Sequence, residues 1–236
     1  MASITIGGLT LDLQRKAIAN LHISVLPPDG KVRVSAPEQL SDTAIRMAVV
    51  KRISWIRKQQ ADFKAQPRQT EREMCSGETH YLWGRGYRLN VQQADANSVK
   101  LKAGRITISS KVEIDANKRQ SLLHDWYRQI LRQRAEPLIK HWQQKLGVQP
   151  SYVGIKRMKT KWGSCNTLSK RIWLNLELVK KPPECLEFII VHELVHLLER
   201  HHNERFMALM YQHLPKWPEY RRTLNKAPLA YDRWGY

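Results

Sequence analysis

The sequence predicts an α+β protein with a β-rich N-terminal part, residues 1–114, and a helical C-terminal part, residues 115–236. In the first part, apolar and polar residues alternate in short runs between turn residues, as in half-buried strands. From Asp115 onward, apolar residues recur at the three- and four-residue spacing of amphipathic helices. A length of 236 residues allows one to two domains, so we place a boundary between residues 114 and 115.

A β-hairpin followed by a helix is predicted near the N-terminus. Val25 and Val32 belong to two alternating runs that flank the turn sequence Pro28-Asp29-Gly30, which predicts the hairpin. Ser41 or Asp42 can cap a helix that ends before Pro67. The apolar residues of this helix fall at helical spacing, at Ile45, Val49, Ile53 and Ile56.

Three further strands are expected before residue 114. They cover residues 81–91, 99–101 and 106–108, and Ala103-Gly104 forms the turn between the last two. The polar stretch 66–78 is predicted to be a loop.

The C-terminal part begins with a long helix that Pro137 is expected to kink and that Gly147 ends. A loop that contains residues 161–165 then leads to a strand at 172–178. Two helices follow: Pro182-Pro183 opens one at about 184–199, and Asn203 caps a second at about 204–214. We find no internal repeat.

Composition indicates a cytoplasmic globular protein. No apolar run is long enough to cross a membrane, and no secretory signal is visible. The three cysteines, Cys75, Cys165 and Cys185, are far apart in sequence, which favours reduced thiols. The 40 Lys and Arg residues exceed the 21 Asp and Glu residues, and this excess attracts polyanions without defining a site. Residues 156–181 are especially basic, with eight cationic residues against Glu177 alone.

The helix at 184–199 carries an HExxH motif, His192-Glu193-Leu194-Val195-His196. Residues i and i+4 lie on one helix face, so His192 and His196 can bind the same ion. Glu193 points about 100° round the helix, which suits a general base better than a ligand. The motif follows the apolar run 188–191, and burying these polar groups together would cost several kcal/mol unless a metal satisfied them. We therefore predict a catalytic Zn²⁺ site, which Ni²⁺ or another divalent transition metal can also occupy.

A catalytic zinc site needs a third protein ligand. His202 lies six residues after His196, just past the helix end, and is the favoured candidate. His201 is adjacent to it, and Glu219 is a carboxylate further along the chain, so both remain alternatives.

These residues resemble the YgjP-like metallopeptidase family, which is related to the minigluzincins and other zincin-like peptidases. The resemblance rests on Trp162-Gly163-Ser164-Cys165, on Leu174-Asn175 in a strand, and on HELxH followed by His202 and Phe206. It covers nearly the whole chain. It implies a zincin-like catalytic part with the HExxH helix beside an edge strand, zinc at His192, His196 and His202, and Glu193 as the general base.

The strand 172–178 is expected to be the sheet edge along which a peptide substrate lies. Asn175 is unusual in mid-strand, so it is predicted to line the cleft, although an outward polar position explains it equally well. The resemblance places Trp162, Gly163 and Ser164 near the cleft. Gly163 can allow close backbone approach, and Ser164 can hydrogen-bond a substrate.

Two alternatives to a peptidase follow from charge. A metal-dependent nucleotide pyrophosphatase would use Lys159 and Lys161 of the basic segment 156–181 to clamp phosphates. An SprT-like protease recruited to DNA would use the same segment for phosphate contacts. The motif outweighs both, because net charge is a weak indicator of substrate.

Overall fold

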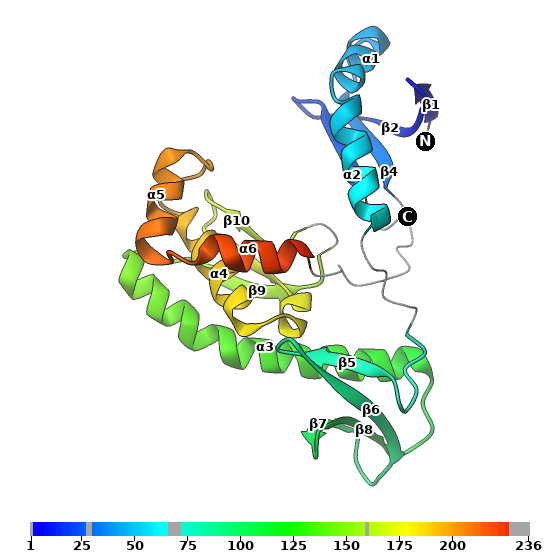
Figure 1. Ribbon diagram of the computed structural model, residues 1–236, viewed down its shortest axis with the longest axis vertical. Helices are drawn as coiled ribbons and strands as arrows, with labels where there is room; N and C mark the ends of the chain where they lie inside the picture. The colour runs from blue at the N-terminus through cyan, green and yellow to red at the C-terminus, as the bar shows by residue number, and fades with distance from the viewer. Residues whose placement is uncertain (1, 27–29, 66–71, 159–160, 227–236) are drawn as a thin grey trace. The chain divides into compact units, whose positions relative to one another are not determined.

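The chain forms two units, residues 1–69 and residues 70–236 (Figure 1). The computed structural model describes residues 2–26, 30–65, 72–158 and 161–226. Within these ranges it contains three sheets and six α-helices, with the strands concentrated in the N-terminal half. The predicted α+β class is confirmed.

The first unit is built on a four-stranded sheet in the order β1-β2-β4-β3. Its strands are β1 (Ala2–Ile6), β2 (Leu9–Lys16), β3 (His22–Leu26) and β4 (Lys31–Pro37). The predicted hairpin is β3–β4, where Val25 pairs with Val32, while Pro28 and Asp29 of its turn lie outside the described residues. β1 and β2 were not predicted, although Gly7-Gly8 between two alternating runs is a hairpin signal.

Two helices cover this sheet where one was predicted. The first, α1 (Asp42–Val50), has Ser41 as its cap, and the Ser41 hydroxyl accepts a hydrogen bond from Ala44 N at 3.2 Å. The chain tightens at Arg52, whose N–H donates to Val49 O three residues back, and α2 (Ile53–Ala65) starts from there. Ile45, Val49 and Ile56 still reach the same core as the sheet.

The second unit begins with another four-stranded sheet, in the order β5-β6-β8-β7. Its strands are β5 (Thr79–Leu82), β6 (Arg85–Gln93), β7 (Ser98–Lys102) and β8 (Arg105–Ser110). The predicted strand 81–91 was wrong as one element, because Trp83 and Gly84 both adopt positive φ and form a turn. The predicted turn at Ala103-Gly104 is confirmed between β7 and β8.

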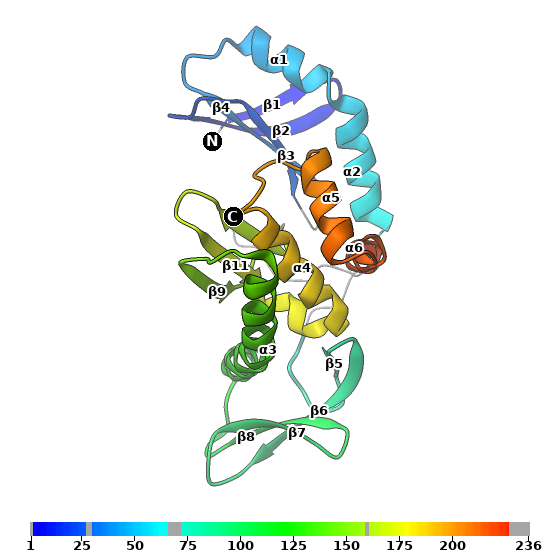
Figure 2. The same cartoon turned by 90° about the vertical axis from the view of Figure 1, so that its left-hand side faces the viewer.

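The long helix α3 (Ala116–Leu146) connects this sheet to the rest of the second unit (Figure 2). The Asp115 carboxylate caps it by accepting from Lys118 N at 2.7 Å, and Gly147 ends it in the left-handed conformation. Leu89 and Ile108 of the sheet are buried in one core with residues of α3 and of the helix that carries the HExxH motif. The expected boundary between residues 114 and 115 therefore falls inside the second unit, where β8 gives way to α3.

A three-stranded sheet follows α3, in the order β10-β11-β9. Its strands are β9 (Tyr152–Lys156), β10 (Gly163–Asn166) and β11 (Arg171–Asn175). Residues 161–165 were predicted to lie in a loop, but residues 163–166 pair with β11 as a strand. The predicted strand 172–178 ends at Asn175, because its side chain caps the 3₁₀ helix η1 (Leu176–Lys180) by accepting from Glu177 N.

Three helices complete the second unit: α4 (Pro183–Val195), α5 (Glu204–His213) and α6 (Trp217–Lys226). The first two were predicted, and α6 was missed. Among the described residues, no helix combines the length and apolar character that a membrane span requires.

Candidate metal centre

Helix α4 supplies two histidines from an otherwise buried segment. Pro183 starts the helix, and Phe188 to Val191 are buried, as are Leu194 and Val195. His192 and His196 stand one turn apart, and the rings lie 4.9 Å apart between centroids. The helix ends at His196, and the chain turns before α5, which brings His202 back to the same place.

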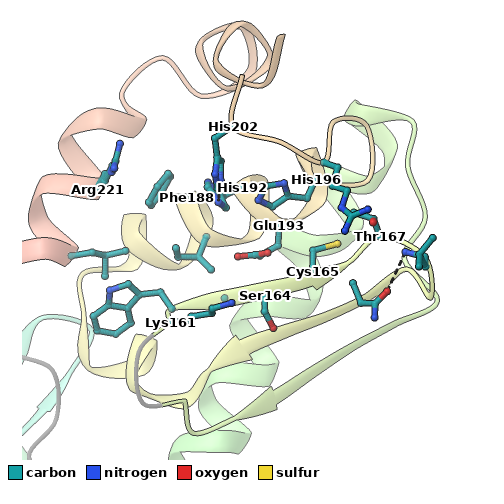
Figure 3. A pocket seen from close by; sticks show the side chains of 17 residues that line it. Lys161, Ser164, Cys165, Thr167, Phe188, His192, Glu193, His196, His202 and Arg221 are labelled. Atoms are coloured by element: carbon teal, nitrogen blue, oxygen red, sulfur yellow. Dashed lines mark hydrogen bonds between the residues drawn. The ribbon is translucent and has the colours of Figure 1, made fainter. Parts of the chain in front are cut away.

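The three imidazoles of His192, His196 and His202 converge (Figure 3). One nitrogen from each ring lies within 4.8 Å of the others, and the Nε2 atoms of His192 and His202 are 3.1 Å apart. Burial and the neighbouring His196 lower the pKa of His192 to about 3, and burial also lowers the pKa values of His196 and His202. Neutral imidazoles are the form that binds metal, so this donor set fits a divalent transition metal.

Backbone and aromatic contacts hold these rings in place. His196 Nδ1 donates to the carbonyl oxygen of Glu199 at 3.2 Å, which leaves Nε2 as the nitrogen with a free lone pair. Phe206 packs against all three imidazoles, with centroid distances of 4.7 to 5.0 Å. Asn203 positions Phe206 by capping α5, since its side chain accepts from Phe206 N at 3.0 Å.

Glu193 lies beside the histidines but belongs to a separate position in the site. Its side chain is buried, and burial raises the pKa of its carboxyl to about 8, against the opposing charge of Lys161. Gly163 of β10 approaches it so closely that an added Cβ would lie 2.8 Å from Glu193 Cγ and Cδ. Any side chain at position 163 would displace this carboxylate, so the close approach expected of Gly163 is made to Glu193.

The histidines and Glu193 open into a cavity of about 660 Å³. Residues 161–168 form one wall, and residues from α4, the following turn and α6 form the other. This combination of buried carboxylate, converging imidazoles and open cavity is what a hydrolytic metal centre requires.

A family model for the YgjP-like metallopeptidase domain matches residues 20–227. The chain belongs to the YgjP-like family. Membership supports a metal-dependent peptidase, and the convergent histidines fit the metal that such an enzyme needs.

Two solved structures are similar to part of this chain, and both are metallopeptidase zymogens. Abylysin of Pyrococcus abyssi is 23% identical over 38% of this chain and 90% of its own, with a TM-score of 0.36. Jannalysin of Methanocaldococcus jannaschii is 24% identical over 38% of this chain and 86% of its own, with a TM-score of 0.35. A search of curated protein sequences gave no match.

The edge strand beside the histidine cluster of this YgjP-like protein is β10, and not the strand at 172–178 as predicted. β11 is paired on both sides, with β10 and with β9, so its backbone groups are already bonded. β10 pairs only with β11 among the described strands, and all four of its residues line the cavity. The WGSC motif therefore contributes the sheet edge itself.

Side chains along β10 point alternately to the two faces of the sheet. Gly163 and Cys165 lie on the side of β10 that faces Glu193. Burial and the Glu193 carboxylate raise the pKa of the Cys165 thiol to about 11. Ser164 lines the cavity, and its hydroxyl points away from the histidines in Figure 3, so the expected hydrogen bond to a substrate stays a prediction. Cys165 does not belong to the convergent histidine cluster.

Asn175 was predicted to line the cleft, and it does not: its side chain is fully buried. Its amide donates to the carbonyl oxygens of Met158 and Lys161 at 2.8 and 2.7 Å, and its N–H donates to Trp162 O at 2.9 Å. Asn175 thus fixes the backbone that leads into β10. The alternative of an outward polar position was also wrong.

The remaining predicted substrate residues separate into distinct places. Lys161 and Trp162 line the cavity, while Lys159 lies outside the described residues. Most other cations of segment 156–181 have their own partners. Lys180 pairs with Glu177 at 2.7 Å, and aromatic rings lie beneath Lys156, Arg171 and Lys181.

The structure brings His202 to the histidine pair, and neither His201 nor Glu219 belongs to the cluster. Two charged residues of the cavity lining, Arg200 and Arg221, were not predicted. Arg221 was missed because α6 was missed, although Trp217, Tyr220 and Leu224 recur at helical spacing.

Proposed function

We propose that this YgjP-like protein is a zinc-dependent peptidase in which His192, His196 and His202 hold the metal. The observation that carries the proposal is the convergence of three imidazoles beside a buried carboxylate in an open cavity. A divalent metal in this site supplies Lewis acidity, which polarises a peptide carbonyl and makes water more acidic. Zinc suits three imidazoles with one open position, and nickel accepts the same donors.

Glu193 serves as the general base in this proposal. Its carboxylate is next to the histidines but is not one of the convergent ligand groups. It accepts a proton from the attacking water and returns it to the leaving amine. Gly163 supports this role, because the missing side chain leaves room for the carboxylate at the cavity wall.

The peptide lies along the free edge of β10 in our proposal. An extended peptide adds to a sheet edge through main-chain hydrogen bonds, which do not depend on its sequence. β10 is the strand that borders the cavity, and the Asn175 bonds hold the segment before it. The free cysteines 75, 165 and 185 further suggest a reducing compartment such as the cytoplasm. The comparisons lend no support to a nucleotide pyrophosphatase or a DNA-associated protease.

Replacement of the base tests this function. Glu193→Gln preserves side-chain size but cannot accept a proton, so kcat for peptide hydrolysis falls by about 10²-fold or more. Zinc content stays at the wild-type level, because Glu193 is not a ligand. Glu184→Gln makes the same charge change at an exposed position of α4 and leaves hydrolysis unchanged. Wild-type turnover by Glu193→Gln would exclude this residue as the base.

A further inference from the structure

The charges around the metal centre are unbalanced. Among the cavity-lining residues that the structure describes, Lys161, Arg200 and Arg221 carry positive charge, and Glu193 is the one carboxylate. A divalent metal would add to this excess. An anionic group that enters the cavity is therefore attracted from several directions.

These three cations form no ion pair with a carboxylate in the described part of the chain. The carboxylate of the nearby Glu199 lies 4.0 Å from the guanidinium of Arg205, and not beside Arg200. The Arg221 guanidinium lies over the Trp217 ring, 5.9 Å from its centroid, and this contact limits its orientation. Asn175 holds the carbonyl of Lys161, so its backbone is also fixed. The cations can therefore pair with a carboxylate that enters the cavity.

Lys161 and Arg221 come from opposite walls of the cavity. Lys161 precedes β10 and Arg221 belongs to α6, and in Figure 3 the histidines lie above Lys161 and to the right of Arg221. Arg200 follows Glu199, which bonds to His196, and so adds positive charge near that histidine. A peptide on the β10 edge places successive side chains on alternate faces at intervals of about 3.3 Å. Side chains on either side of the scissile bond would thus enter the cavity that these cations line.

We propose that the cavity selects peptides with an aspartate or glutamate next to the scissile bond, and that Lys161 and Arg221 are its principal partners. This inference rests on the proposed peptidase function and specifies the substrate class. Phosphate groups would be attracted by the same charges, but an extended acidic peptide also uses the free edge of β10.

Peptide binding tests the inference without requiring turnover. The probes are fluorescent octapeptides of alanine and glycine in which a single Glu is moved along the chain, each matched by a Gln peptide. Binding to the zinc-loaded, full-length Glu193→Gln protein is followed by fluorescence anisotropy. We expect the best Glu position to bind about fivefold more tightly than its Gln match, as for two exposed charge pairs. This preference shrinks as salt is raised.

The matched control lies one residue away. Arg221→Gln reduces the Glu preference to about twofold or less, and Arg221→Lys restores most of it because the charge is retained. Arg222→Gln removes the same charge from the same helix, at an exposed position outside the cavity lining, and preserves the preference. Equal binding of Glu and Gln peptides would overturn the inference, as would an equal loss in both arginine variants.

Hydrolysis by the wild-type enzyme separates this inference from the proposed function. Equal cleavage of Glu and Gln peptides, together with equal affinity, leaves the peptidase intact and refutes the acidic preference. Preferential binding of Glu peptides without cleavage of any peptide refutes the peptidase and supports the anionic selectivity. Hydrolysis of a nucleoside triphosphate, with no peptide bound, would overturn both.

Discussion

The two four-stranded sheets of this protein have the same topology but different surroundings. In each, two antiparallel hairpins are joined by a parallel central pair, β2 with β4 in the first sheet and β6 with β8 in the second. Each sheet is followed by helix. The chain therefore contains a structural repeat, although the sequence analysis found none.

The sheets differ in the core to which they contribute. Leu11 and Val34 of the first sheet are buried with residues of α1 and α2, in a core confined to the first unit. Leu89 and Ile108 of the second sheet belong to the core that contains α3 and the histidine-bearing helix α4. The same arrangement of strands thus makes a unit of its own in one case and part of the scaffold of the histidine cluster in the other.

The first turn of each sheet illustrates this difference. Trp83 N donates to Val179 O at 2.8 Å, and Gly84 N donates to Lys180 O at 3.3 Å, so the second sheet is bonded to the segment just before α4. The corresponding turn of the first sheet, Gly7-Gly8, is bonded within its own unit, where Arg57 donates to Gly7 O at 3.3 Å. We infer that damage to the second sheet reaches the metal centre and damage to the first does not.

Matched core truncations should give the largest effect. Leu11 and Leu89 occupy equivalent places, since each pairs with the second residue of its parallel partner strand. Either Leu→Ala change should cost about 3 kcal/mol. Hydrogen exchange should then rise in residues 2–65 for Leu11→Ala and in residues 72–226 for Leu89→Ala. Only Leu89→Ala should weaken zinc binding, and an equal loss of zinc affinity in Leu11→Ala would contradict the distinction.

Acid should lower the stability of the second unit through His124 of α3. The helices of the first unit, α1 and α2, contain no histidine. Burial, with the nearby charge of Arg157, lowers the pKa of His124 to about 4 from 6.5. Between these values the unfolded chain binds more protons, so stability is present above about pH 6.5 and is lost toward pH 4. The loss is about 2 kcal/mol after allowance for partial exposure. The pH dependence of unfolding should be correspondingly flatter in His124→Gln, whereas an unchanged dependence would exclude His124 as its source.

Turn glycines should show the smallest effect. Gly8 and Gly84 both have positive φ, so alanine costs about 1 kcal/mol at either position. An added Cβ at Gly84 would also lie 3.1 Å from Pro182, whereas nothing lies within 4 Å at Gly8. Gly84→Ala should therefore be the more destabilising variant in urea titrations. The reverse order would show that the turn can move away from Pro182 without cost.

The fold class and the histidine motif could be predicted because they depend on local spacing. Alternation identified most strands, and the i, i+4 relation together with a six-residue offset identified His192, His196 and His202. Long-range pairing could not be predicted in the same way. The exchange of edge and central roles between β10 and β11 depends on where β9 joins the sheet, which no local pattern records.

Polar residues that depend on distant parts of the chain were the least predictable. Asn175 looked like a cleft residue because asparagine is rare in strands, but its amide bonds explain its position fully. Arg221 reaches the cavity through α6, whose short helical pattern lies between two prolines and was not recognised. The carbonyl oxygens to which the Asn175 amide donates lie 14 or more residues away in sequence. Arg221 belongs to a helix that was not predicted.

Zinc binding by two adjacent histidine variants tests the central claim most directly. Wild-type protein should bind one zinc ion per chain, measured by elemental analysis and by competition with a chromophoric chelator. His202→Ala should lower the affinity by about 10²-fold or more, because it removes one of three ligands. His201→Ala, one residue away and outside the cluster, should bind zinc like the wild type. Full zinc affinity in His202→Ala, or its loss in His201→Ala, would contradict a metal centre built from His192, His196 and His202.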